Sequence, residues 1–116
     1  NFCNFLLNNS EFAARLSSLA LESAYSGVND AYLKIVRDKS FTSAGYSLSV
    51  GNNSVDIAVC KDSPPPTCAG AGYQRITATG RISSGGHMLY RRLEAVVDVN
   101  SSTGGATLVS IGEVAI

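Results

Sequence analysis

The chain has 116 residues, enough for one domain with a small core but too few for two. Its 9 basic and 9 acidic residues balance, which argues against binding nucleic acid or an anionic membrane through overall charge. Charged residues make up only 16% of the chain, against about 25% in an average protein, and small uncharged polar residues are plentiful. This composition is common in secreted and cell-surface proteins.

The opening residues, 1–9, are expected to form a disordered tail in which Cys3 is a free thiol. They carry neither the basic stretch nor the small-residue cleavage site of a signal peptide. The chain also has no run of eighteen consecutive apolar residues, so no membrane-spanning helix is expected.

A single helix is predicted over residues 10–38, a stretch without proline. Apolar residues recur through it at steps of three and four, which lays one apolar stripe along a helix. A helix of this length measures about 43 Å, more than the diameter of the remaining globular part, so its first half should protrude. Gly27 marks a bend or a close contact in the helix interior. The residues expected to pack the helix on a sheet are Tyr25, Val28, Tyr32 and Ile35.

An alternation of apolar and polar residues replaces the helical pattern after Lys39 and predicts an antiparallel sheet over residues 44–116. Turn-forming Gly and Asn residues at 51–53 separate the first two strands, which read as a hairpin. The expected strands are 46–50, 55–59, 73–82, 87–100 and 106–116. The sequence therefore predicts one α+β domain over 1–116, with a long N-terminal helix on an antiparallel sheet of four to six strands.

Cys60 and Cys68 flank the segment "KDSPPPT" and are expected to form a disulfide. Closing a loop of about nine residues stabilises a fold by roughly 2.5 kcal/mol in the chain-entropy model. A structural zinc site would need four Cys or His ligands, and the 3 cysteines and 1 histidine of this chain lack the paired spacing of such sites. A disulfide here implies an oxidising compartment.

The sequence shows no arrangement typical of a catalytic site. A serine or cysteine nucleophile needs a base in reach, and the single histidine, His87, follows two glycines in a predicted turn. Glu94 and Asp98 could share a strand face as a carboxylate pair, but that face is predicted to be solvated. We therefore expect no enzymatic activity, no cofactor and no bound metal.

One strand offers a candidate binding strip. Tyr73, Arg75 and Arg81 alternate along the run "YQRITATGRI", so they project from the same face of a strand. An aromatic ring with two guanidinium groups could contact a glycan or a protein. The same residues are also ordinary outward positions of a strand.

The order of several segments resembles the bacterial type IV pilin-like family, which includes minor pilins and pseudopilins. The resemblance covers residues from about 16 to the end. It rests on an alanine-rich helix, a hairpin, a strand and a following arginine-bearing strand, with the sequences "SLALESAYSGVNDAYLKIVRDKSF", "YSLSVGNNSVDIAV", "YQRITATGRI" and "RRLEAVVDVN".

The resemblance implies a pilin-like fold and a structural role. In that family the second half of the long helix packs on the sheet, while its apolar first half anchors the subunit in the membrane before assembly and lies in the filament core afterwards. The implied partners are other pilin subunits, in a homo- or hetero-oligomeric filament, and the assembly machinery. The implied location is the bacterial cell surface, with adhesion or DNA uptake as possible roles. The helix face expected to take part in assembly is Phe12, Leu16 and Leu19.

The start of the chain departs from the family pattern. The prepilin cleavage motif, the acidic residue near the mature N-terminus and the apolar half-helix are absent from this sequence. We therefore expect the chain to be the soluble portion of a longer protein, whose missing N-terminal segment would contact the membrane. The alternative is a monomeric secreted or cell-surface module that binds a glycan or a protein. The ligand is not specified by the sequence under either hypothesis.

Overall fold

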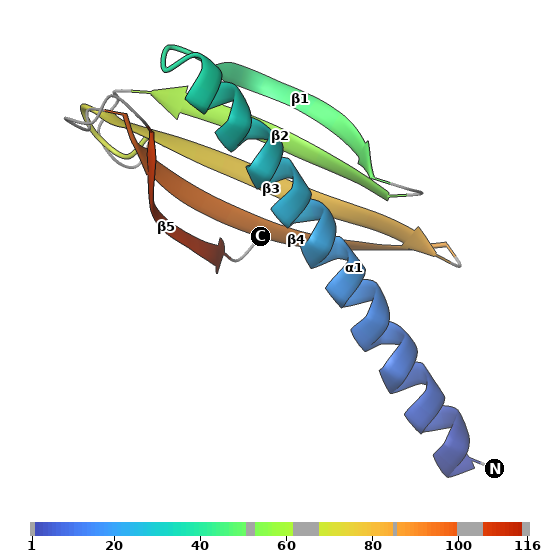
Figure 1. Cartoon of the computed structure of the whole chain (residues 1–116). Helices are drawn as coiled ribbons and strands as arrows, with labels where there is room; N and C mark the ends of the chain where they lie inside the picture. The colour runs from blue at the N-terminus through green and yellow to red at the C-terminus, as the bar shows by residue number, and fades with distance from the viewer. Residues whose placement is uncertain (1, 51–52, 62–67, 85, 100–105, 115–116) are drawn as a thin grey trace.

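One helix lies across one face of a five-stranded antiparallel sheet (Figure 1). The structure, a computed structural model, describes residues 2–50, 53–61, 68–84, 86–99 and 106–114. Side chains are described in these ranges from Arg15 onward, except those of Val50, Ser84 and His87. The elements are α1 (Phe2–Arg37), β1 (Ser43–Val50), β2 (Asn53–Lys61), β3 (Tyr73–Ser84), β4 (His87–Asp98) and β5 (Thr107–Val114). The α+β class predicted from the sequence is confirmed.

The strands follow one another across the sheet in chain order, β1-β2-β3-β4-β5. All four neighbouring pairs are antiparallel, so each pair of consecutive strands can be joined by a local connection. The register is continuous between β2 and β3 and between β3 and β4, and it shifts once within each outer pair. β1 and β5 are therefore the edge strands.

The helix begins at Phe2, not at Ser10, so the tail expected over residues 1–9 is helical from Phe2 onward. The first proline of the chain comes long after the helix, and extending a helix that already exists is far easier than nucleating one. The side chains of Cys3 and Phe12 lie outside the described part. At the other end Asp38 closes the helix, because its carboxylate accepts hydrogen bonds from the backbone NH and the hydroxyl of Ser40.

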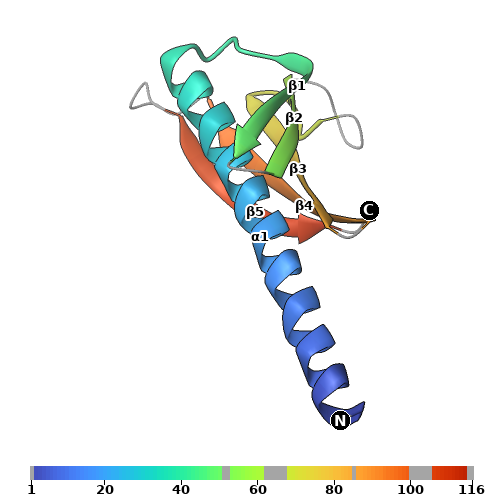
Figure 2. The ribbon, with the colours of Figure 1, turned by 90° about the vertical axis from the view of Figure 1, so that its right-hand side faces the viewer.

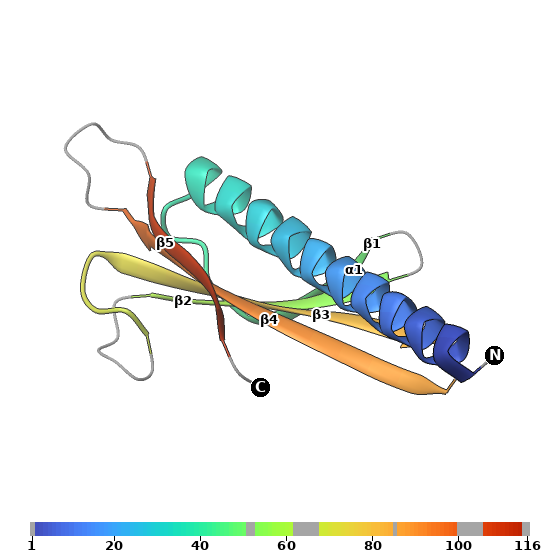
Figure 3. The same ribbon diagram turned by 90° about the horizontal axis from the view of Figure 1, so that it is seen from below.

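The first half of α1 extends beyond the sheet, and the second half lies on it (Figures 1 and 2). The molecule is correspondingly elongated, with extents of 61 × 23 × 22 Å along its principal axes. Seen from below, the helix lies on one side of the sheet only, so the other sheet face is left uncovered by it (Figure 3). We call these the helix face and the outer face.

The core lies between the second half of α1 and the helix face of the sheet. Val28 and Ile35 are buried there, and Tyr32 is half-buried, with its hydroxyl donating to the carbonyl oxygen of Ala106 at 2.9 Å. Tyr25 was expected in the core but is 50% exposed. The reason is helical geometry. The face that meets the sheet is centred on small residues, and Tyr25 lies about 100° around the helix from one of them. The buried helix residues of that face are Ala20, Ala24, Val28, Ala31 and Ile35.

Small residues bring the backbones of α1 and β3 into direct contact. A Cβ atom at Gly80 would lie 2.0 Å from the carbonyl oxygen of Ala20, and one at Gly27 would lie 2.7 Å from a methyl carbon of Val55. Ser23, also buried, satisfies its hydroxyl within the helix by donating to the carbonyl oxygen of Leu19 at 3.0 Å. The close contact expected of Gly27 is therefore present, and Gly80 makes a still closer one.

An arginine on the helix face fixes the helix where it leaves the sheet. Arg91 of β4 donates to the Ser17 hydroxyl of α1 and, through two nitrogens at 2.5 Å, to the carboxylate of Glu113 on β5. The hydrogen bonds from Arg91 hold the pKa of Glu113 below its ordinary value. Arg91 interrupts an otherwise apolar strand face in the sequence, and these contacts are the reason that a charge is accommodated there.

Replacing Gly80 tests the close approach of helix and sheet. We expect Gly80→Ala to lower the free energy of unfolding by about 3 kcal/mol, because the added methyl group would meet helix backbone that cannot rotate away. Gly112→Ala on β5 is the matched control, since a Cβ there has no atom within 4 Å, and its effect should stay within about 0.5 kcal/mol. Urea unfolding of the three proteins measures both values. Equal stabilities would contradict the close packing.

Candidate functional site

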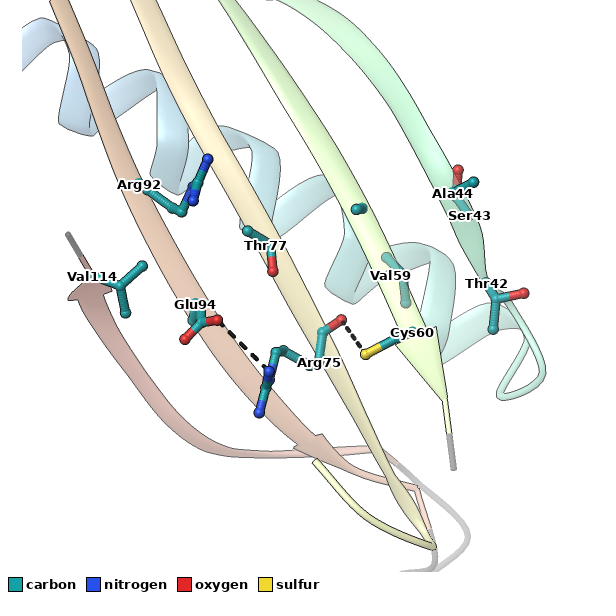
Figure 4. A pocket seen from close by; sticks show the side chains of 11 residues that line it. Thr42, Ser43, Ala44, Val59, Cys60, Arg75, Thr77, Arg92, Glu94 and Val114 are labelled. Atoms are coloured by element: carbon teal, nitrogen blue, oxygen red, sulfur yellow. Dashed lines mark hydrogen bonds and ion pairs between the residues drawn. The ribbon is translucent and has the colours of Figure 1, made fainter. Parts of the chain in front are cut away.

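The outer face of the sheet contains a groove of about 670 Å³ that crosses the strands (Figure 4). Its floor is low because Ala58 of β2 and Thr77 of β3, which are paired across the two strands, are small. Longer side chains rise beside this floor from β3 and β4, and residues of β1 and β5 close its sides. The lining residues are Thr42, Ser43, Ala44, Ala58, Val59, Cys60, Arg75, Thr77, Arg92, Glu94 and Val114.

The disulfide between Cys60 and Cys68 is present and lies at one end of the groove, with the two Cα atoms 5.7 Å apart. Arg75 is held against it, because its Nη2 donates to the carbonyl oxygen of Cys68 at 3.1 Å. The Nη1 atom of Arg75 lies 3.9 Å from the Oε1 atom of Glu94, a loose ion pair seen in Figure 4. The proline run, Pro64 to Pro66, lies outside the described residues. The disulfide therefore positions a charged side chain of the groove.

A second arginine, Arg92, lines the groove farther along β4. Its Nε donates to the hydroxyl of Thr79 at 3.1 Å, across the β3–β4 pairing. Within the described residues it makes no ion pair with a carboxylate, unlike Arg75, Arg81 and Arg91. Its terminal nitrogens are therefore not neutralised by any described acidic group.

The candidate binding strip is only partly brought to this groove. Tyr73, Arg75 and Arg81 all lie on the outer face of β3, as their spacing predicts, but only Arg75 lines the groove. Arg81 lies farther along the strand, where its Nε is 3.1 Å from a carboxylate oxygen of Asp56. Tyr73, 37% exposed, is at the strand's start.

Sequence reasoning missed Arg92 and Thr77. Both could have been found by pairing the two predicted strands about their turn, because that register sets Thr79 opposite Arg92 and Thr77 opposite Glu94. The candidate binding strip was chosen from one strand at a time. Its residues therefore share a face of β3, but they do not all line the same groove.

A smaller, mostly apolar groove of about 450 Å³ lies between α1 and β5. Tyr25 and Tyr32 of the helix face Leu108 and Ile111 of the edge strand across it. Tyr25, Leu108 and Ile111 remain between 37% and 50% exposed. The helix covers β1 to β4 and leaves this edge open.

The groups considered for catalysis are not assembled into a site. Glu94 is paired with Arg75, and Asp98 is set opposite Tyr73 at the far end of the β3–β4 pair. His87 begins β4, and its side chain is outside the described set. In the described part of the chain, no three His, Cys, Asp or Glu side chains come together in a way that could hold a metal ion.

A polar cluster links α1 to β1 beside the core. The carboxylate of Asp30 accepts hydrogen bonds from Lys34, at 2.9 Å, and from the hydroxyl of Tyr46, at 2.8 Å. Burial raises the pKa of Asp30, but the hydrogen bonds from Lys34 and Tyr46 outweigh burial, so the pKa lies below its ordinary value. Burial and the contact with Asp30 raise the pKa of Tyr46.

Comparisons with known proteins do not supply a function. No family model matches the chain, and no curated protein or solved structure matches it either. Over the residues that the structure describes, no helix has the length and apolarity needed to cross a bilayer.

The link between Asp30 and Tyr46 predicts a pH dependence of stability. Because the folded-state pKa of Asp30 is lowered, its contribution is complete above the unfolded-state pKa of about 4 and is lost as the pH falls through the folded-state value. The free energy of unfolding should therefore fall less between pH 7 and pH 3 in Asp30→Asn than in the unsubstituted protein. The difference between the two falls should be about 1 kcal/mol or less. Tyr46→Phe, which removes one of the hydrogen bonds, should give an intermediate result. Urea unfolding at several pH values measures this, and identical pH profiles would contradict it.

Proposed function

We propose that this protein is a structural subunit of an extracellular type IV pilus-like filament, a pilin or minor pilin, that assembles through the first half of α1. The observation that carries the proposal is the extension of α1 past the sheet (Figure 2). The half of the helix that extends past the sheet cannot bury its apolar side chains against that sheet. Neighbouring copies of the same element are the simplest source of that burial.

The apolar residues of the protruding half support this role. Leu16 and Leu19 are one helical turn apart, and Leu19 is 37% exposed. Phe12 continues the same spacing toward the N-terminus, although its side chain is outside the described part. A stripe of apolar side chains on a helix gains stability only when another surface covers it. In the proposal, that surface is the helix of the next subunit.

The disulfide and the surface composition fit the proposed location. A disulfide between Cys60 and Cys68 persists in an oxidising compartment such as the cell exterior. The low charge content and zero net charge are compatible with close packing of many copies, because identical charged surfaces would repel one another. Before assembly, an apolar segment preceding α1 would hold the subunit in the membrane, where it would meet the assembly machinery.

The groove on the outer face favours a second candidate function, a secreted or cell-surface module that binds a glycan or protein. The groove lies on the sheet face opposite α1, so helix-mediated assembly leaves it accessible (Figures 3 and 4). The two functions are compatible in one protein, as an adhesive subunit. They differ in what the protruding helix does.

Substitution on the protruding helix separates the two. Leu19→Asp should leave the melting temperature nearly unchanged, because the side chain is outside the core, yet prevent incorporation into filaments in cells that produce the full-length protein. Ser18→Asp, at an exposed position next to it, is the matched control and should still incorporate. Ile35→Asp, fully buried, should instead unfold the domain by several kcal/mol.

The measurement is the amount of subunit in filaments sheared from the cell surface, with secreted and cell-bound fractions as totals. Normal filament content with Leu19→Asp and with Leu16→Asp would contradict assembly through this helix face. It would leave the binding module as the better hypothesis.

A further inference from the structure

We propose that the outer-face groove is a binding site for a carboxylate-bearing sugar, in which Arg92 recognises the carboxylate and the hydroxyl groups that line the groove contact the ring. This site goes beyond the assembly role, because it lies on the opposite sheet face from α1 and uses none of the helix residues. It also replaces the strip Tyr73–Arg75–Arg81 with a different set of residues.

The hydrogen bond from Arg92 to Thr79 orients its guanidinium group. A guanidinium has five N–H donors, and the contact with the Thr79 hydroxyl uses the one on Nε. The two terminal nitrogens remain as a fork whose geometry matches a carboxylate. Because the side chain is half-buried and already anchored, less rotational freedom is lost when a ligand binds.

The charges around the groove favour a ligand with one negative charge. Its described lining contains two arginines, Arg75 and Arg92, and one acidic residue, Glu94. Arg75 is engaged with Glu94 and with the backbone of Cys68, so the charge of Arg92 is the one left to attract an anion. A polyanion would gain little from a single such charge on a protein whose net charge is zero.

The remaining lining suits a sugar. Hydroxyl groups of Thr42, Ser43 and Thr77 border the groove and can both donate and accept hydrogen bonds. Ala44, Ala58 and Val114 add small apolar surfaces to the same lining, against which the C–H groups of a sugar ring can pack.

The disulfide supports the site from one end. Cys68 is fully buried, and its carbonyl oxygen receives the hydrogen bond from Arg75. Arg75 in turn lies near Glu94, which keeps the Glu94 carboxylate drawn toward the disulfide end and away from Arg92 (Figure 4). Among the described residues Glu94 makes its ion pair with Arg75 and none with Arg92, so the terminal nitrogens of Arg92 are left to an external carboxylate.

The test is a titration of the isotope-labelled chain, followed by amide chemical shifts in NMR. Glucuronate and galacturonate are the probes, and glucose, acetate and a short peptide with a free C-terminus are the comparisons. We expect at least one uronate to shift amides of β3 and β4 around Thr77 and Arg92. Glucose, acetate and the peptide should each bind at least about tenfold more weakly, because each lacks one part of the recognised group.

Substitutions assign the site. Arg92→Gln should weaken uronate binding by about tenfold or more, the value typical of losing a charged hydrogen bond. Arg15→Gln changes the net charge equally on the exposed side of the helix and should bind like the unsubstituted protein. Ala58→Leu places a larger side chain on the groove floor and should also abolish binding. It is the second variant to measure if Arg92→Gln proves unfolded.

Three results would overturn the proposal: no shifts at the groove with either uronate, unchanged affinity in Arg92→Gln, or equal binding of acetate or the peptide. Filament assembly does not enter these measurements. Failure of the sugar site and failure of the assembly role can therefore be told apart.

Discussion

The contact between the backbones of α1 and β3 is the constraint on which the other features depend. Gly80 has no side chain, and the carbonyl of Ala20 occupies the space that a Cβ would need. The backbone of Ala24 belongs to the same contact, and Gly27 lies close to the side chain of Val55 on β2, so the two glycines together restrict the position of α1 on the sheet. That position determines which helix residues are buried and where the helix leaves the sheet. In that position α1 covers neither the edge strand β5 nor the outer face of the sheet.

The two sheet faces have different roles because strand side chains alternate. Arg91 and Arg92 are adjacent in sequence and carry the same group, yet they project to opposite sheet faces and make different contacts. Arg91 projects to the helix face, where it joins Ser17 to Glu113 and holds the helix at its point of exit. Arg92 projects to the outer face and lines the groove. A shift of one residue in the β3–β4 register would exchange these environments and disrupt both.

The sequence predicted the parts of this structure that depend on local pattern. Alternation located each of the strands in the described residues, and the proline-flanking cysteines, Cys60 and Cys68, form the predicted disulfide. Periodicity located the helix but not its start, because residues 8–10 are Asn and Ser, residue types that often cap a helix, yet here they lie within it. Tyr25 was misplaced because helix periodicity alone does not show which side of a broad stripe meets the sheet. Arg92 was missed because a groove across strands depends on their register.

The central claim is that α1 is held on the sheet by close packing along its second half, as the proposed assembly through its first half requires. Amide hydrogen exchange of the isolated chain, measured residue by residue, tests it most directly. The account predicts that amides from about Ala24 to Ile35 exchange only through global unfolding, while those from Phe2 to about Ala14 exchange much faster, with protection changing near Ser17 where Arg91 holds the helix. Uniform protection along the whole helix, or fast exchange in its second half, would contradict the account.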